Sequence, residues 1–274
     1  MSQSGETMDL LIPFRLAKEY GQTRINVVNK NNSTLARENH IGVFLHCGRE
    51  FSVASTKAFV CQVTALTLVA IWFAQNKNFN GTKKVRQRVM NELKMLSTNF
   101  KLTLEIVEEK SKEIAPQLKS SRHIFFCGTG LCSVIAQEAA LKMKELTYIH
   151  CQDINIKQLA NNFFNFYKQN PKTPVIFIVT DKQPDKVEML NNIELLIKKT
   201  DIMAIMVTDI KDKTMRDRLT NLTEGQDLFR PDGSGLALSA LLCVLPLQRL
   251  AFDLTIELGY HPDKPRNLAK ELTT

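Results

Sequence analysis

The chain has 274 residues, of which 44% are hydrophobic and 23% charged, and this composition excludes a chain that is disordered throughout. The net charge of +8 comes from lysines scattered along the sequence. Because no basic stripe or groove-reading motif accompanies it, we expect no nucleic-acid partner. Six cysteines without a C-x-x-C pair predict free, buried thiols in a reducing compartment. The five histidines lack the short spacing of zinc ligands, so we expect no metal and no cofactor.

The first part of the chain contains two predicted helices and two predicted strands. A helix is expected over residues 6–20, ended by a glycine, and strands over residues 24–28 and 41–46. The run at 57–75 is apolar on all sides, but it is slightly short and carries a glutamine and two threonines. We therefore predict a fully buried core helix there and no membrane partner. Two strands are too few for a complete sheet, so this part is expected to be incomplete.

The rest of the chain predicts a more complete α/β domain. Apolar positions at helical spacing over 83–118 indicate one or two amphipathic connecting helices. Strands and helices then alternate, and continuous apolar runs in the strands are typical of a parallel sheet flanked by helices on both faces. The predicted strands are 123–127, 148–151, 175–180, 202–208 and 227–229, and the predicted helices are 133–146, 185–198 and 235–258.

One predicted helix carries an unusual set of charges. Glu138, Lys142 and Glu145 fall at positions i, i+4 and i+7, on a different face from the apolar stripe of that helix. On a solvated surface such a set is an ordinary ion pair. In a dry pocket, a carboxylate beside a lysine can instead move a proton. The residues alone leave both interpretations open.

Two hydroxyl-rich segments precede predicted helices. The first is Ser2-Gln3-Ser4-Gly5-Glu6-Thr7, which places hydroxyls and backbone N–H groups where a helix dipole favours an anion. A strand that would support this loop would have to precede residue 1. The second segment, residues 52–56, supplies hydroxyls that serve equally well as ordinary helix caps.

Four motifs in order along the chain carry a family resemblance. They are residues 2–7; 53–58, with the sequence Val-Ala-Ser-Thr-Lys-Ala; 138–145, with Glu138 and Ala-Leu-Lys-Met-Lys-Glu; and 265–270, with Pro-Arg-Asn-Leu-Ala-Lys. This set closely resembles the isomerase half of glutamine:fructose-6-phosphate aminotransferase (isomerizing), the glucosamine-6-phosphate synthase family. That half consists of two SIS (sugar isomerase) domains.

The resemblance implies a domain organisation. Residues 1–80 would be a partial first SIS domain, 81–119 connecting helices, 120–258 a second SIS domain and 259–274 a C-terminal tail. The α/β fold would be a parallel sheet flanked by helices in each domain, with the first domain incomplete at its N-terminus. The family implies a cytoplasmic protein of amino-sugar and UDP-N-acetylglucosamine metabolism that binds a hexose 6-phosphate. It also implies a homodimer, or a heterodimer with a full-length synthase.

The resemblance also implies roles for individual residues. Glu145 would move the proton between C1 and C2 of the sugar, Lys142 would assist at the hydroxyls, and Lys270 would engage the open-chain carbonyl. The substrate-binding residues would be Ser2, Gln3, Ser4 and Thr7 at the phosphate, Val53 and Ser55 along the sugar, and Ala269 beside Lys270.

Several positions depart from the family pattern. Residues 157–163 match a family segment whose histidine opens the sugar ring, but they contain no histidine. Asn161 cannot relay a proton at neutral pH. Thr129 replaces an arginine, Glu271 replaces a serine, and Pro13 interrupts the helix behind the first loop. We therefore expect impaired catalysis, and we expect the glutaminase domain to be absent.

Three hypotheses follow from the motifs and the departures. The chain is a working isomerase or ammonia-dependent synthase half, or a non-catalytic protein that binds sugar phosphate or a partner. The third hypothesis is a truncated gene product, because the phosphate loop begins directly after Met1.

Overall fold

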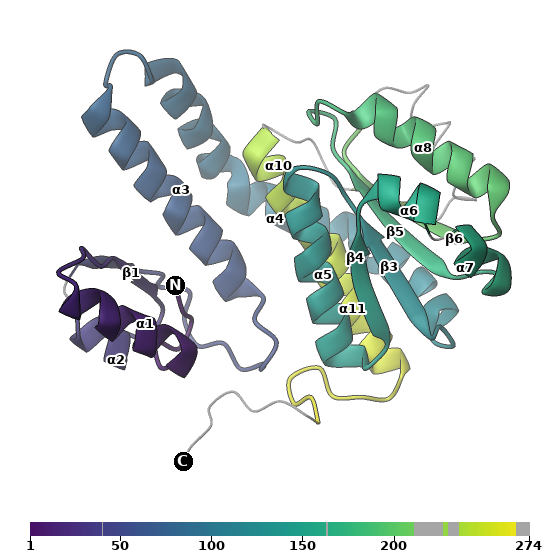
Figure 1. Ribbon diagram of the computed structural model, residues 1–274, viewed down its shortest axis with the longest axis horizontal. Helices are drawn as coiled ribbons and strands as arrows, with labels where there is room; N and C mark the ends of the chain where they lie inside the picture. Colours follow the sequence, from purple (N-terminus) through teal and green to yellow (C-terminus); the bar gives the residue numbers. More distant parts are fainter. Residues whose placement is uncertain (40, 163, 211–226, 230–235, 267–274) are drawn as a thin grey trace. The chain divides into compact units, whose positions relative to one another are not determined.

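A computed structural model describes all residues except 40, 163, 211–226, 230–235 and 267–274 (Figure 1). The described residues form two compact units, one up to Arg88 and the other from Val89 onward. Each unit contains parallel strands joined by helices.

The first unit contains a small parallel sheet with helices between its strands. β1 and β2 pair in parallel, and Ser2 forms a further parallel bridge with Val28 of β1. The predicted helix and both predicted strands are present, although each is shorter than expected; the short helix α2 was not predicted. The elements are α1 (Met8–Glu19), β1 (Asn26–Val28), α2 (Thr34–Arg37), β2 (Gly42–Phe44) and α3 (Lys57–Lys77).

A small apolar cluster holds α1 and α2 against β1. Leu11 of α1, Val28 of β1 and Leu35 of α2 are each at most 4% exposed. Pro13 lies inside α1, where its ring nitrogen has no N–H to donate to the preceding turn. The helix nevertheless continues to Glu19, since the flanking residues pack on this cluster.

The predicted burial of α3 is wrong. Only 17% of its most apolar stretch is buried, and Trp72 is 59% exposed. An apolar sequence on all sides indicates that a helix lacks a polar face, but its burial depends on which elements pack against it. By length and composition, α3 and the stretch Leu238–Glu257 both qualify as membrane spans. The latter is 72% buried, as is typical of a core helix.

The second unit contains the complete sheet. The helix α4 (Lys83–Leu118) enters this unit as one continuous helix, where one or two were expected. The helices α6 and α7 were not predicted, and the predicted helix 235–258 is divided at Cys243. The further elements are β3 (His123–Cys127), α5 (Leu131–Thr147), β4 (His150–Ile154), α6 (Ile156–Asn162), α7 (Phe164–Gln169), β5 (Pro174–Val179), α8 (Lys186–Lys199), β6 (Met203–Thr208), β7 (Asp227–Phe229), α10 (Leu236–Leu242) and α11 (Val244–Glu257).

The five strands of this sheet are all parallel, in the order β4-β3-β5-β6-β7. This confirms the predicted α/β fold with a parallel sheet flanked by helices. Alternate strand residues, such as Phe125 and Phe177, form a core with residues of α6, α7 and α8. The intervening residues, such as Phe126 and Ile176, are fully buried on the other face, where α5 contacts β3, β4 and β5 (Figure 1).

The turn between β3 and α5 depends on two glycines for different reasons. A Cβ on Gly128 would lie 2.4 Å from the carbonyl oxygen of Cys132, which belongs to the backbone of α5. Gly130 has a φ of 54° but open space around its Cα. Gly128 therefore allows the first turn of α5 to approach β3 closely, whereas Gly130 only provides the backbone conformation.

We predict that Gly128→Ala and Gly130→Ala both destabilise the second unit, for different reasons. The first substitution requires α5 to move, and overpacking of this kind typically costs about 1–3 kcal/mol. The second places an alanine at a φ of 54° and a ψ of −125°, and a backbone conformation this unfavourable for a residue with a side chain costs about 1–3 kcal/mol. Urea unfolding followed by circular dichroism measures both. Unchanged stability in Gly128→Ala would show that close helix approach does not limit this turn.

Candidate functional site

The N-terminal loop, residues 2–7, is held together by its own hydroxyl groups. The backbone N–H of Ser2 donates to the carbonyl of Val27, so the loop begins as an extended segment beside β1. The Ser2 hydroxyl lies 2.9 Å from the Thr7 hydroxyl and accepts a hydrogen bond from the N–H of Gly5. Ser4 accepts one from the N–H of Glu6. These bonds fold the loop into a tight turn before α1.

Gly5 and Glu6 attach this loop to the start of α2. Gly5 has a φ of 68°, and a Cβ there would lie 2.1 Å from the Ser33 hydroxyl, so a larger residue would push α2 away. The Glu6 carboxylate accepts a hydrogen bond from the backbone N–H of Thr34. Hydrogen bonding with the side chain of Thr34, supported by this backbone bond, lowers the pKa of Glu6 and keeps its side chain ionised.

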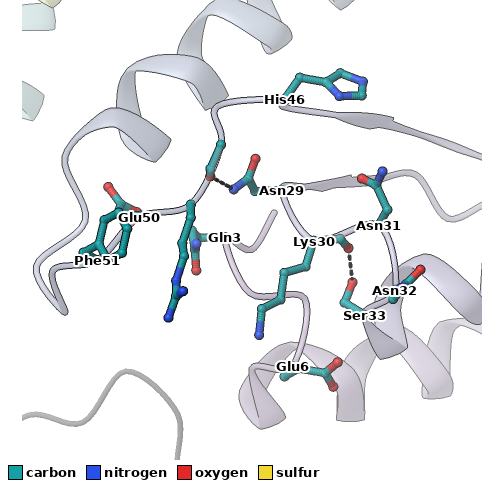
Figure 2. Close-up of a pocket in the computed structure, with 12 residues that line it drawn as sticks. Gln3, Glu6, Asn29, Lys30, Asn31, Asn32, Ser33, His46, Glu50 and Phe51 are labelled. Atoms are coloured by element: carbon teal, nitrogen blue, oxygen red, sulfur yellow. Dashed lines mark hydrogen bonds between the residues drawn. The ribbon is translucent and has the colours of Figure 1, made fainter.

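A polar cavity of about 1080 Å³ lies at the carboxyl ends of β1 and β2 (Figure 2). We refer to it as the first-unit pocket. Its lining combines amides, a hydroxyl, basic groups and two carboxylates from three loops that are distant in sequence. The lining residues are Gln3, Glu6, Asn29, Lys30, Asn31, Asn32, Ser33, His46, Gly48, Arg49, Glu50 and Phe51.

Asn29 connects two of these loops. Its side-chain nitrogen donates to the carbonyl of Gly48 at 2.8 Å (Figure 2), and its side-chain oxygen accepts from the backbone N–H of Cys47 at 3.1 Å. The segment after β2 is thereby tied to the end of β1. His46 precedes this segment with a φ of 50°, a conformation that is uncommon for a residue with a side chain.

The carboxylate of Glu50 fixes the segment that joins the pocket to α3. Glu50 is only 5% exposed and accepts a hydrogen bond from the hydroxyl of Ser55. It also accepts from the backbone N–H groups of Thr56 and Ala58, at 2.7 and 3.4 Å. An acidic group at this position caps the N-terminus of α3 and favourably opposes its dipole.

The structure places the predicted substrate-binding residues of the first unit in different environments. Gln3 lines the pocket, whereas the hydroxyl of Ser2 is buried within the loop. Ser55 is held by Glu50. Sequence reasoning missed the contributions of Asn29, Lys30, His46, Arg49 and Glu50. Asn29 and Lys30 directly follow one predicted strand and His46 ends the other, and this position is a signal because the carboxyl ends of parallel strands collect ligand-binding groups.

Three of the four charged residues of α5, in the second unit, form one largely buried cluster. The Nζ atom of Lys142 lies 2.6 Å from Oε2 of Glu145 and 3.9 Å from Oε1 of Glu138. The Lys142 side chain is 7% exposed, that of Glu138 13% and that of Glu145 22%. The ion pair is therefore shielded from water at Lys142 and partly shielded at the two carboxylates.

The pKa of Glu138 is raised to about 7, and burial is the main cause. Lys142 opposes this shift and Glu145 adds to it. One ammonium group can balance one carboxylate, and the shorter contact assigns it to Glu145. Glu138 therefore exchanges its proton near neutral pH, which is the property required of a general acid or base.

Several predicted features fall elsewhere. Ala269, Lys270 and Glu271 lie outside the described residues. Thr129, at the carboxyl end of β3, accepts a hydrogen bond from the side chain of Gln183. Residues Ile156–Asn162, in the segment without histidine, form α6. In the described ranges, no group of three or more histidine, cysteine, aspartate or glutamate residues is placed to hold a metal ion.

Both units match one known family of protein domains. The SIS domain model matches residues 1–72 and 117–222, one segment in each unit. The chain therefore belongs to the SIS domain family.

Its relatives of known name belong to one kind of enzyme within this family. The chain is 35% identical over 283 residues to glutamine–fructose-6-phosphate aminotransferase (isomerizing) of Tropheryma whipplei, and 34% identical over 275 residues to that of Thermococcus kodakarensis. Both alignments cover the whole chain but 43% of the relative. The C-terminal domain of glucosamine-fructose-6-phosphate aminotransferase from Francisella tularensis superposes with a TM-score of 0.84 at 28% identity, over 96% of this chain and 71% of that one. The predicted family resemblance is confirmed.

We predict that Glu138 makes the stability of the second unit depend on pH. Its pKa in the folded protein, about 7, exceeds the ordinary value of 4.5. Folding therefore favours the protonated form, and the associated stability is present below pH 4.5 and is lost as the pH rises through 7. Between pH 5 and pH 8 the wild type should lose about 2 kcal/mol relative to Glu138→Gln, whose side chain does not titrate.

Urea unfolding of the two proteins at several pH values measures this difference. Subtracting the two curves removes the contribution of all other titrating groups. Parallel curves over this range would show that Glu138 titrates normally.

Proposed function

We propose that the first-unit pocket binds a hexose 6-phosphate, and that the chain is a slow isomerase of such sugars. Fructose 6-phosphate is the expected ligand, since it appears in the names of the relatives. The observation that carries this proposal is the convergence of three polar loops on one cavity. Amide and hydroxyl groups suit sugar hydroxyls, and basic groups suit a phosphate.

The charged residues of the pocket lining are two carboxylates and two cations. Its two carboxylates, Glu6 and Glu50, accept hydrogen bonds from backbone N–H groups of α2 and α3 and so serve the fold. The cations Lys30 and Arg49 line the same cavity. The guanidinium of Arg49 lies 4.9 Å from the ring centre of Phe51, and such stacking orients it without using its N–H donors.

For the second unit, we propose that Glu138, Lys142 and Glu145, which we call the α5 cluster, transfer the proton during isomerisation. Conversion of a ketose to an aldose requires a base that reaches both C1 and C2, with a cation near the developing enediolate oxygen. Glu145 would be this base and Lys142 the cation. Glu138, whose pKa is about 7, is a second carboxyl group able to exchange the proton.

The reaction is expected to be slow because residues 157–163 contain no histidine. Opening of the sugar ring then lacks the acid or base that the family resemblance assigns to this segment. Loss of such a group typically lowers the rate by about 100- to 10,000-fold. The alternative is a protein that binds the sugar phosphate without catalysis, and the missing histidine favours this alternative as well. The cytoplasmic location and the dimer partners remain predictions, and the chain spans 43% of its relatives' length.

We predict that fructose 6-phosphate binds the intact chain and that fructose does not. Isothermal titration calorimetry measures both affinities. Replacing Gln3 by alanine removes one hydrogen bond to the ligand and should weaken binding about tenfold. Gln22→Ala is the matched control, because Gln22 is an exposed glutamine of the same unit. Equal affinity for fructose and its phosphate would contradict the assignment of an anion site.

We predict a low rate of glucose 6-phosphate formation that Glu145→Gln abolishes. Coupling the product to glucose-6-phosphate dehydrogenase gives a continuous measurement through NADPH. Glu257→Gln is the control, because Glu257 pairs with Lys119 on the surface of the same unit. A turnover near the typical enzyme value of about 10 per second would refute impaired ring opening. An unchanged rate in Glu145→Gln would remove this residue from the mechanism.

A further inference from the structure

Two histidines meet at the amino end of the second-unit sheet. His123 is the first residue of β3 and His150 the first residue of β4, and the parallel pairing places them directly opposite each other. Their Nδ1 atoms lie 3.1 Å apart, although the two residues are 27 positions apart in sequence. Residues that are opposite each other in paired strands project from the same face of the sheet. The sheet therefore brings the two imidazole rings together.

Neighbouring rings hold this pair in place. The His123 ring packs edge to face against the His150 ring, with the ring centres 5.2 Å apart, and against Phe166 of α7, at 5.7 Å. Phe166 in turn contacts Phe125, a core residue two positions along β3 from His123. His123 is half-buried and His150 is exposed, so a dissolved ion can reach both rings. The pair is thus oriented by the fold and open to solvent.

The separation of the two nitrogen atoms suits two ligands of one metal ion. Histidine nitrogen binds Zn²⁺ at about 2.0–2.1 Å, so two such nitrogens on one ion lie about 2.9 Å apart at a right angle and about 3.3 Å apart at the tetrahedral angle. The observed 3.1 Å lies between these two values. A hydrogen bond between the two rings fits the same distance, and it is the competing interpretation.

The protonation of the rings is compatible with metal binding. Two N–H groups that face each other repel, so at least one of the two Nδ1 atoms carries no proton. A neutral imidazole can hold its single proton on Nε2, which leaves the lone pair of Nδ1 free. When both rings adopt this tautomer, a metal ion can take the place of the proton that a hydrogen bond would share.

We propose that His123 and His150 bind one divalent transition-metal ion through their Nδ1 atoms. Imidazole suits Zn²⁺, Ni²⁺ and Cu²⁺, of which Cu²⁺ binds most tightly, whereas Mg²⁺ and Ca²⁺ prefer oxygen ligands. In the part of the chain that the structure describes, no third histidine, cysteine, aspartate or glutamate completes the set. Cys151 follows His150 but projects from the opposite face and is 1% exposed. Water therefore fills the remaining coordination positions.

An ion at this position links an edge strand to the sheet. β4 is the outermost strand on its side and is paired with β3. An ion that binds the folded chain and joins the first residues of these strands stabilises the sheet at its edge. The sequence did not indicate the pair, because strand pairing and not short spacing brings the two histidines together. The site is also independent of the proposed sugar-phosphate function.

The first experiment measures zinc binding to the intact chain by isothermal titration calorimetry. We expect Zn²⁺ to bind and Mg²⁺ not to bind. His123→Asn and His150→Asn each remove a ligand, so each should weaken zinc binding by more than the roughly 10- to 100-fold that loss of a group supporting a ligand costs. His261→Asn is the matched control, because His261 is an exposed histidine of the same unit. Wild-type affinity in both ligand variants, or no zinc binding by the wild type, would overturn the proposal.

The second experiment counts the histidine ligands and needs no variant that folds. One equivalent of Cu²⁺ is added to the wild-type chain, and electron spin echo envelope modulation detects the remote nitrogen of each coordinated imidazole. We expect two imidazoles on the copper ion in the wild type and in His261→Asn, and fewer than two in His150→Asn. A single imidazole or none in the wild type would show that the two histidines only share a hydrogen bond.

Discussion

Parallel pairing of strands determines where the polar side chains of the first unit meet. In a parallel pair, both strands end at the same edge of the sheet, and the segments that follow them lie side by side. Ser2, β1 and β2 are paired in this way, so residues 3–6, 29–33 and 46–51 gather at one edge. The cavity requires no long loop, because the topology itself brings three short segments together.

The hydrogen bonds of Asn29 and Glu50 convert this topology into a defined site. Asn29 fixes the beginning of the segment after β2, and Glu50 fixes its end on α3. Both side chains bond to backbone groups, so these bonds do not depend on the identity of the side chains in the segment. The segment between β2 and α3 is thus held at two points.

The sequence predicts what is local and misses what depends on distant partners. Continuous apolar runs were sufficient to predict the parallel sheet of the second unit, and helical spacing was sufficient to bring Glu138, Lys142 and Glu145 together. Neither the burial of that cluster nor the exposure of α3 could be predicted, because both depend on other elements. The break at Cys243 was missed because the apolar pattern continues across it. Glu50 was missed because a single acidic residue in a loop carries no periodic signal.

The α5 cluster shows how a cost in stability relates to chemistry. Two carboxylates beside one ammonium leave one negative charge without compensation, and burial makes that charge expensive. Oε1 of Glu138 is buried and accepts no hydrogen bond. A site selected only for stability would carry a neutral side chain at this position. The retained carboxyl group has a pKa of about 7 and can bind or release a proton under physiological conditions. Such a strained group persists where its chemistry is used, or where selection for its removal is weak. Glu138→Gln separates these two cases. If the carboxyl group is used in catalysis, its removal stabilises the fold and lowers the rate. If selection against it is merely weak, its removal stabilises the fold and leaves the rate unchanged.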